Sequence, residues 1–151
     1  MQNQLVFKKL FLLFAFFVPL RETPFIMTEN NLSKIIVDSA FKIHTTLGPG
    51  LLESVYEAVL AHELRKRGCK VIQQQAIPVV YENVQLEIGF RADLIINNKV
   101  LIEIKSVEAI SPVHLKQLRT YLRLMDKKLG LLINFNVDLI KNGIRRVVNN
   151  L

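Results

Sequence analysis

Two short apolar segments in the middle of the chain face each other across an asparagine turn, and this pairing limits the possible folds most. Residues 91–96 and 100–105 are rich in β-formers, and Asn97-Asn98-Lys99 between them is typical of a hairpin loop. A loop centred on Asn98 sets Asp93 opposite Glu103. A slip of one residue would turn every side chain of a strand to the other face. The sequence therefore predicts an antiparallel hairpin of defined register.

The segments on both sides of this hairpin complete an α/β pattern. Apolar residues recur at helical spacing over 31–47, 51–67 and 112–125. Asn30 or Asn31 is expected to cap the first helix, and Ser111-Pro112 is a typical start for the third. Further strands are expected at 71–75, 77–81, 84–88, 130–135 and 144–148. Helices on either side of a run of strands predict a mixed sheet with helices packed on it.

The composition narrows the functional classes. The 151 residues are 50% hydrophobic and 22% charged, which excludes a disordered or fibrous chain. The single cysteine, Cys69, excludes an intrachain disulfide framework and a zinc ribbon built on cysteine pairs. The formal charge of +7 favours polyanionic partners, with nucleic acid first and an anionic membrane second.

Residues 1–26 differ in character from the rest of the chain. Lys8 and Lys9 precede a short apolar run that Pro19 closes, and this run is too short to span a membrane. It is open whether this extension lies outside the working protein, with translation starting at Met27, or is an uncleaved membrane-associating tail or an export signal. We expect a working domain at 27–151, cytoplasmic, with a formal charge of +5 and without stable membrane insertion.

The hairpin carries the residues with the clearest chemistry. Asp93 and Glu103 are expected to face each other, and Glu103 and Lys105 share a face because side chains alternate along a strand. Two opposed carboxylates repel, and Mg²⁺ or Mn²⁺ between them would remove that cost. The backbone carbonyl of Ile104 could add another oxygen ligand. Lys105 could hold an attacking water or stabilise negative charge on a phosphate.

Each of these residues also has a plainer interpretation. Glu103 and Lys105 could form a solvated ion pair, and Asp93 could be an ordinary residue at a strand end. Glu53 could only stabilise the start of its helix. Gln117 and Tyr121, four residues apart, could form an exposed polar helix edge.

Taken together, the motifs resemble the GxxExxY family, a branch of the PD-(D/E)XK nuclease superfamily. Gly50, Glu53 and Tyr56 match the motif that names the family, and Asp93, Glu103 and Lys105 match the D…(D/E)xK core of the superfamily. The spacings Gly89-x-x-x-Asp93 and Gln117-x-x-x-Tyr121 resemble those of RecB-type nucleases. The likeness runs from about residue 30 to the end, with Ala92 where the superfamily usually has proline.

This resemblance implies a restriction-endonuclease-like core and a metal-dependent nuclease. It implies that Glu53 joins Asp93 and Glu103 around Mg²⁺ or Mn²⁺, and that Gln117 orients substrate or water. The expected function is therefore a phosphodiesterase acting on nucleic acid, with DNA favoured. The alternative is a nucleic-acid-binding or complex-forming protein that keeps the nuclease fold without cutting. A small domain with no second module leaves room for a protein partner or a homodimer.

Overall fold

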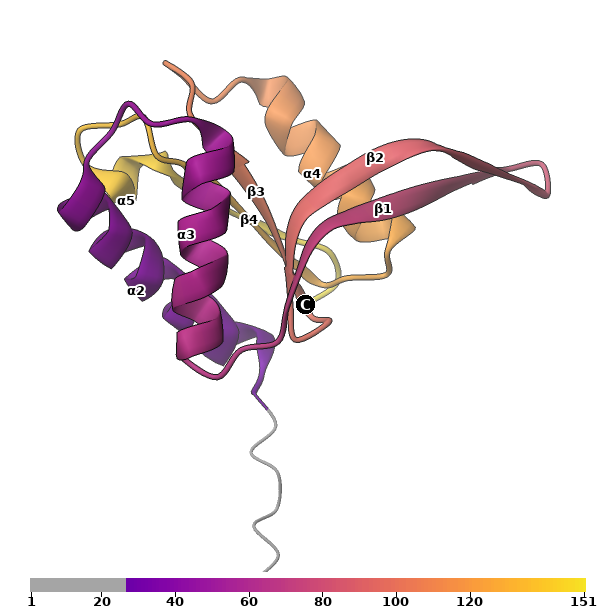
Figure 1. The fold of residues 1–151 in the computed structure, drawn as a ribbon. Helices are drawn as coiled ribbons and strands as arrows, with labels where there is room; N and C mark the ends of the chain where they lie inside the picture. The colour runs from indigo at the N-terminus through magenta and orange to yellow at the C-terminus, as the bar shows by residue number, and fades with distance from the viewer. Residues whose placement is uncertain (1–26) are drawn as a thin grey trace, which may run out of the picture.

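The computed structural model describes residues 27–151, and the expectations for residues 1–26 lie outside this range. A five-stranded sheet forms the centre of the molecule (Figure 1). No helix in the described part is long and apolar enough to cross a membrane. In chain order the elements are α2 (Glu29–Leu47), α3 (Glu53–Lys66), β1 (Val71–Tyr81), β2 (Val84–Ile96), β3 (Val100–Lys105), α4 (Pro112–Leu124), β4 (Leu129–Asn134), α5 (Ile140–Gly143) and β5 (Ile144–Val148).

The register expected for the central hairpin is confirmed. β2 pairs antiparallel with β3, and Ile95 lies opposite Leu101. Asn97 and Asn98 have φ values of 50° and 56°, a left-handed conformation that asparagine tolerates better than most residues. β3 then pairs parallel with β4, and α4 supplies the crossover between them. The mixed α/β architecture expected from the sequence is therefore present.

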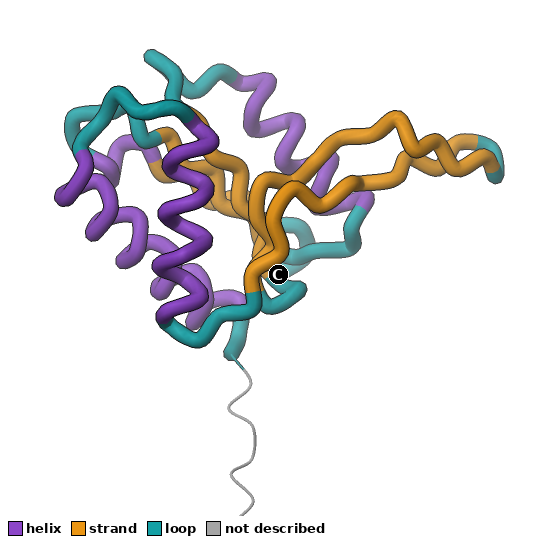
Figure 2. The backbone as a smooth tube through the Cα atoms, viewed as in Figure 1, coloured by secondary structure: helices purple, strands orange, loops and turns teal. Residues whose placement is uncertain are grey.

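Helices cover both faces of the sheet, with α2 and α3 on one side and α4 on the other (Figures 1 and 2). Val100, Ile102 and Ile104 point into the apolar core under α2 and α3. Leu101, on the opposite face, packs with Leu118 of α4. The alternation along β3 thus divides the core into two layers and leaves Glu103 on the α4 side.

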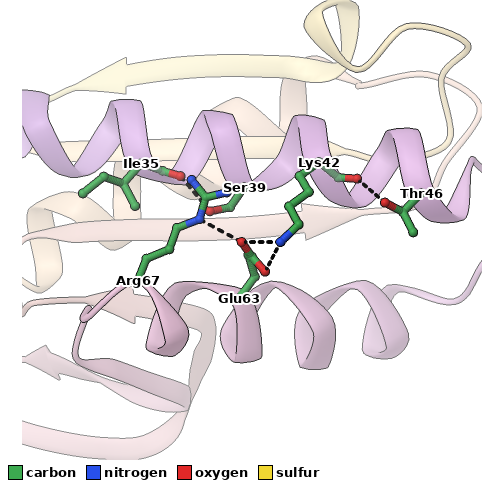
Figure 3. Close-up of polar contacts among 6 residues, drawn as sticks. All are labelled: Ile35, Ser39, Lys42, Thr46, Glu63 and Arg67. Atoms are coloured by element: carbon green, nitrogen blue, oxygen red, sulfur yellow. Dashed lines mark hydrogen bonds and ion pairs between the residues drawn. The ribbon is translucent and has the colours of Figure 1, made fainter.

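An ion-pair cluster fastens α2 to α3 (Figure 3). The Glu63 carboxylate contacts Lys42 Nζ at 2.9 Å and Arg67 Nε at 2.8 Å. Hydrogen bonds from Lys42 and Arg67 lower the pKa of Glu63 to about 2. The charge of Arg67 is therefore engaged by this glutamate.

Several local expectations differ from the structure. The cap of α2 is Thr28, whose side chain accepts from the Asn31 N–H while Asn31 accepts from the Thr28 N–H, so the helix starts earlier than expected. α3 begins at Glu53 and not at Leu51. The strands expected at 71–75 and 77–81 form one strand, as do those at 84–88 and 91–96, and the short helix α5 was not expected.

The long hairpin formed by β1 and β2 leaves the body of the molecule as a two-stranded arm (Figure 1). The pairs between β2 and β3 run from Ile96↔Val100 to Leu94↔Ile102, whereas β1 and β2 stay paired out to Tyr81↔Val84. Asp93 therefore stands at the point where β2 leaves β3. This branch point, and not the tip of the arm, positions the candidate site.

Candidate metal-dependent nuclease site

Asp93 bonds to the backbone at the end of β3. Its Oδ2 accepts a hydrogen bond of 2.7 Å from the Ile104 N–H, at the place where the backbone pairing between β2 and β3 has ended. Burial raises the pKa of Asp93, and the bond from Ile104 and the charge of Lys105 oppose that rise. Because the N–H and C=O of a strand residue point to the same side of the strand, the Ile104 carbonyl is directed to the β2 side of β3 as well.

Glu103 is the buried carboxylate of the site. Only 5% of it is exposed, so the solvated ion pair considered above is excluded. Its Oε2 lies 3.8 Å from Lys105 Nζ, while its Oε1 is buried without a hydrogen-bond partner in the described part of the chain. Burial, followed by the negative charge of Asp93, raises the pKa of Glu103 to about 8. We expected mutual repulsion to be the main cause, but desolvation is the larger effect.

Glu53 lies at the edge of the site and not in its centre. Its Oε1 accepts a hydrogen bond of 3.0 Å from the N–H of Ser106, the residue that follows Lys105, and Ser106 Oγ donates to Leu51 O at 2.7 Å. The start of α3 is thereby bonded to the end of β3. Glu53 thus has a specific long-range contact in addition to its favourable position in the first turn of the helix.

The other residues of the GxxExxY motif shape the loop before α3. Gly50 has a φ of +99°, which strongly favours glycine. Tyr56 is fully buried, stacks on Phe135 with ring centroids 4.3 Å apart, and donates a 2.6 Å hydrogen bond to Gly48 O. It also accepts from the Leu51 N–H at 3.2 Å. Tyr56 therefore fixes the loop that precedes Glu53.

Gln117 and Tyr121 approach the acidic residues from α4. Gln117 Nε2 donates to Tyr121 Oη, and the Tyr121 ring packs 5.0 Å from that of Phe90 in β2. Tyr121 is only 2% exposed, so this is not the exposed polar edge considered above. Burial raises the pKa of Tyr121, and the charges of Glu103 and Asp93 raise it further. The hydroxyl of Tyr121 is thus close enough to both carboxylates to interact with their charges.

A cleft of about 700 Å³ opens between the start of α3 and Asp93. Its lining includes Glu53 and Asp93, whereas the other predicted site residues Glu103, Lys105, Gln117 and Tyr121 do not line it. Two further lining residues, Glu57 and Gln74, were not recognised in the sequence. The position of Glu57 four residues after Glu53, on the same side of a helix, was the available signal. Gln74 gave none beyond its place in a run of three glutamines.

Asn134 is a third residue whose role the sequence did not reveal. It is 1% exposed at the end of β4, where its Nδ2 donates to Val107 O at 2.8 Å and its Oδ1 accepts from the Val107 N–H at 3.0 Å. This pair of bonds holds the chain directly after Ser106 against β4. It therefore stabilises the end of β3, where the Ser106 N–H donates to Glu53.

A sequence-family model of the PD-(D/E)XK nuclease superfamily matches residues 30–147. The chain belongs to this superfamily. Comparison with curated proteins and with solved structures gives no match. Membership indicates a nuclease-type function, and PD-(D/E)XK nucleases generally use divalent metal ions, commonly Mg²⁺.

The side chains at the branch point of this PD-(D/E)XK domain are chemically suited to bind a cation. Glu103 Oε1 is a buried oxygen without a hydrogen-bond partner, and burial penalises the charge of both Glu103 and Asp93. A hard divalent cation would coordinate the unpartnered oxygen and neutralise the buried negative charge. In the described residues, however, no three Asp, Glu, His or Cys side chains are grouped closely enough to hold a metal ion. The grouping of Glu53, Asp93 and Glu103 around a metal ion therefore stays a prediction.

Proposed function

We propose that this protein is a metal-dependent phosphodiesterase of the GxxExxY branch that acts on nucleic acid, with DNA as the favoured substrate. The observation that carries the proposal is Glu103, a buried carboxylate with an unpartnered oxygen, next to Asp93 and Lys105 in a domain of nuclease ancestry. A carboxyl group in this environment is unfavourable for folding alone, because its charged form is desolvated and lacks a full set of hydrogen bonds.

In this proposal the metal is Mg²⁺ or Mn²⁺, bound by Asp93, Glu103 and the carbonyl of Ile104 with help from Glu53. When bound, it lowers the pKa of a water ligand and neutralises charge on a phosphate. Lys105 holds the nucleophilic water and stabilises negative charge at phosphorus. Gln117 and Tyr121 complete the pocket from α4, with the amide of Gln117 orienting substrate or water.

The formal charge of the chain supports a polyanionic substrate. α4 carries Lys116, Arg119 and Arg123 along one side, which lines a shallow groove with Val148 and Asn149. Cations in this arrangement attract phosphates without reading a sequence, so they suit a nuclease whose target is selected elsewhere. A homodimer or a protein partner would supply such selection.

The test is cleavage of single-stranded, duplex and branched DNA by the full chain, with Mg²⁺, Mn²⁺ or EDTA. We expect cleavage with metal, none with EDTA, and loss of activity in Asp93→Asn. Asp38→Asn, which removes an exposed carboxylate of α2, is the matched control and should cut like the wild type. If none of these substrates is cleaved with either metal, the proposal that the protein is a nuclease is rejected.

A second candidate is a non-cleaving protein that binds nucleic acid or assembles with a partner. The lack of a preassembled group of three metal-ligating side chains in the described part of the chain favours it. Isothermal titration with Mn²⁺ distinguishes the two candidates. Binding that disappears in Asp93→Asn supports the nuclease, and DNA binding without metal binding supports the non-cleaving protein.

A further inference from the structure

Gln74 has an unusual backbone at the branch point of the arm. Its φ is 52°, in the left-handed region that a glutamine adopts only when its surroundings impose it. Its neighbours Gln73 and Gln75 pair with Leu94 and Ala92 of β2, so Gln74 lies across from Asp93. A strained residue therefore faces the aspartate of the candidate site.

The side chain of Gln74 joins two carboxylates that belong to different elements. Its Nε2 donates to Glu57 Oε2 of α3 at 2.7 Å and to Asp93 Oδ1 of β2 at 3.4 Å. An amide nitrogen carries two protons, so both bonds can exist at the same time. The second Asp93 oxygen, Oδ2, accepts from the Ile104 N–H at 2.7 Å. Both oxygens of Asp93 are thus held, one by β1 and one by β3.

The surrounding contacts hold Gln74 in this conformation. Its carbonyl accepts a hydrogen bond of 3.2 Å from Arg91 Nη1, and its amide is drawn toward α3 by Glu57. Gln73 also donates to Glu57, at 3.2 Å, but among the hydrogen bonds of the described residues none joins it to Asp93. Of these two adjacent glutamines, only the one with the left-handed backbone reaches the aspartate. Backbone strain of this kind is often retained where it positions a functional group.

We propose that Gln74 is a positioning residue, which uses its strained backbone and its amide to orient the Asp93 carboxylate for metal binding, with Glu57 as the anchor on α3. The inference rests on the proposed function for the identity of the ligand. Its structural part, the orientation of Asp93, is independent of that function and can be measured in the metal-free protein.

The experiment compares Gln74→Gly with Gln73→Gly in the full chain. Glycine at position 74 relieves the left-handed strain and removes the amide, so we expect a melting temperature equal to the wild type or up to about 5 °C higher. In the same variant, Gln74→Gly, protection of the Ile104 amide from hydrogen exchange should fall at least about tenfold, because Asp93 loses one of its two hydrogen-bonded restraints. Mn²⁺ affinity should fall by about 10- to 100-fold, as for loss of an outer partner of a metal ligand.

Gln73→Gly is the matched control, with the same substitution at an adjacent position paired with Leu94. It should lower the melting temperature, since glycine weakens a strand, while Ile104 exchange and Mn²⁺ affinity stay as in the wild type. Gln74→Asn tests the amide alone, since asparagine tolerates the left-handed region, and it should restore part of the protection of Ile104.

The outcomes separate the inference from the proposed function. Unchanged Ile104 exchange in Gln74→Gly would overturn the positioning role, as would equal Ile104 effects in Gln74→Gly and Gln73→Gly. A large fall in melting temperature of Gln74→Gly would make Gln74 a structural residue and also overturn it. A wild type that binds no Mn²⁺ would reject the proposed metal site, while the Ile104 measurement would still decide the role of Gln74.

Discussion

Replacement of Glu103 by glutamine should stabilise the metal-free protein, and the gain should depend on pH. Burial first, and Asp93 second, raise the pKa of Glu103 to about 8, whereas a glutamate in an unfolded chain titrates near its ordinary value of about 4.3. The folded state therefore retains this proton at pH values where the unfolded chain has lost it. The stability contributed by the protonated carboxyl is complete below the unfolded pKa and is lost as the pH rises toward about 8.

The magnitude follows from this difference in pKa. Each unit corresponds to about 1.4 kcal/mol, so the wild type loses about 3 kcal/mol of stability between pH 4 and pH 7, and about 5 kcal/mol by pH 9. Glutamine has nearly the shape of the protonated acid and does not ionise. Glu103→Gln should match the wild type at pH 4 and exceed its melting temperature by about 10 °C at pH 7.

The assay is thermal or denaturant unfolding of the two proteins between pH 4 and pH 9 in EDTA. Glu63→Gln is a control of opposite sign, since Lys42 and Arg67 lower the pKa of Glu63 to about 2. The stability that Glu63 contributes is present above its unfolded pKa and is lost as the pH falls toward 2, so Glu63→Gln should destabilise the protein at neutral pH. A Glu103→Gln protein that is less stable than the wild type at pH 7 would refute the reasoning.

Three other substitutions test separate parts of the structure. Lys105→Ala should reduce turnover at least about a hundredfold in a cleavage assay while changing unfolding free energy by about 1 kcal/mol or less, since the ammonium of Lys105 lies beside the Glu103 carboxylate. Tyr56→Phe removes the hydroxyl that bonds Gly48 and Leu51, and denaturant unfolding should show a loss of about 1–2 kcal/mol. Gly143→Ala would bring its Cβ into a clash with the backbone oxygen of Asn134, so it should lower stability by at least about 2 kcal/mol in the same assay.

The sequence was sufficient for those parts of the fold that depend on local chemistry. Two asparagines with left-handed backbones set the register of β2 and β3, and the alternation of Ile102 and Glu103 assigned each side chain of β3 to its layer. The start of α4 was also predictable, because Pro112 suits the first turn of a helix and Ser111 takes the cap position, although its Oγ has no hydrogen-bond partner in the described residues.

The parts of the site that depend on tertiary contact could not be predicted. The bond from the Ile104 N–H to Asp93 exists because β2 separates from β3 at this residue, and no local pattern marks that separation. Glu57 and Gln74 meet across 17 positions in the chain. The run of three glutamines gave no reason to single out its middle residue, since its conformation is imposed by Glu57 and Arg91 from other elements.

The burial of Glu103 connects the stability of this fold with its proposed chemistry. For folding alone, a neutral side chain of similar size would be better at this position, because a desolvated carboxyl with an unpartnered oxygen opposes folding at neutral pH. The apolar layers on both faces of the sheet hold the residue in place in spite of this cost. A cation that binds only the folded state would turn the contribution of Glu103 to folding stability from unfavourable to favourable. It favours the ionised form of the carboxyl and stabilises the fold by mass action. Addition of Mn²⁺ at pH 7 should therefore raise the melting temperature of the wild type more than that of Glu103→Gln. An equal rise in the two proteins would show that Glu103 does not bind the metal.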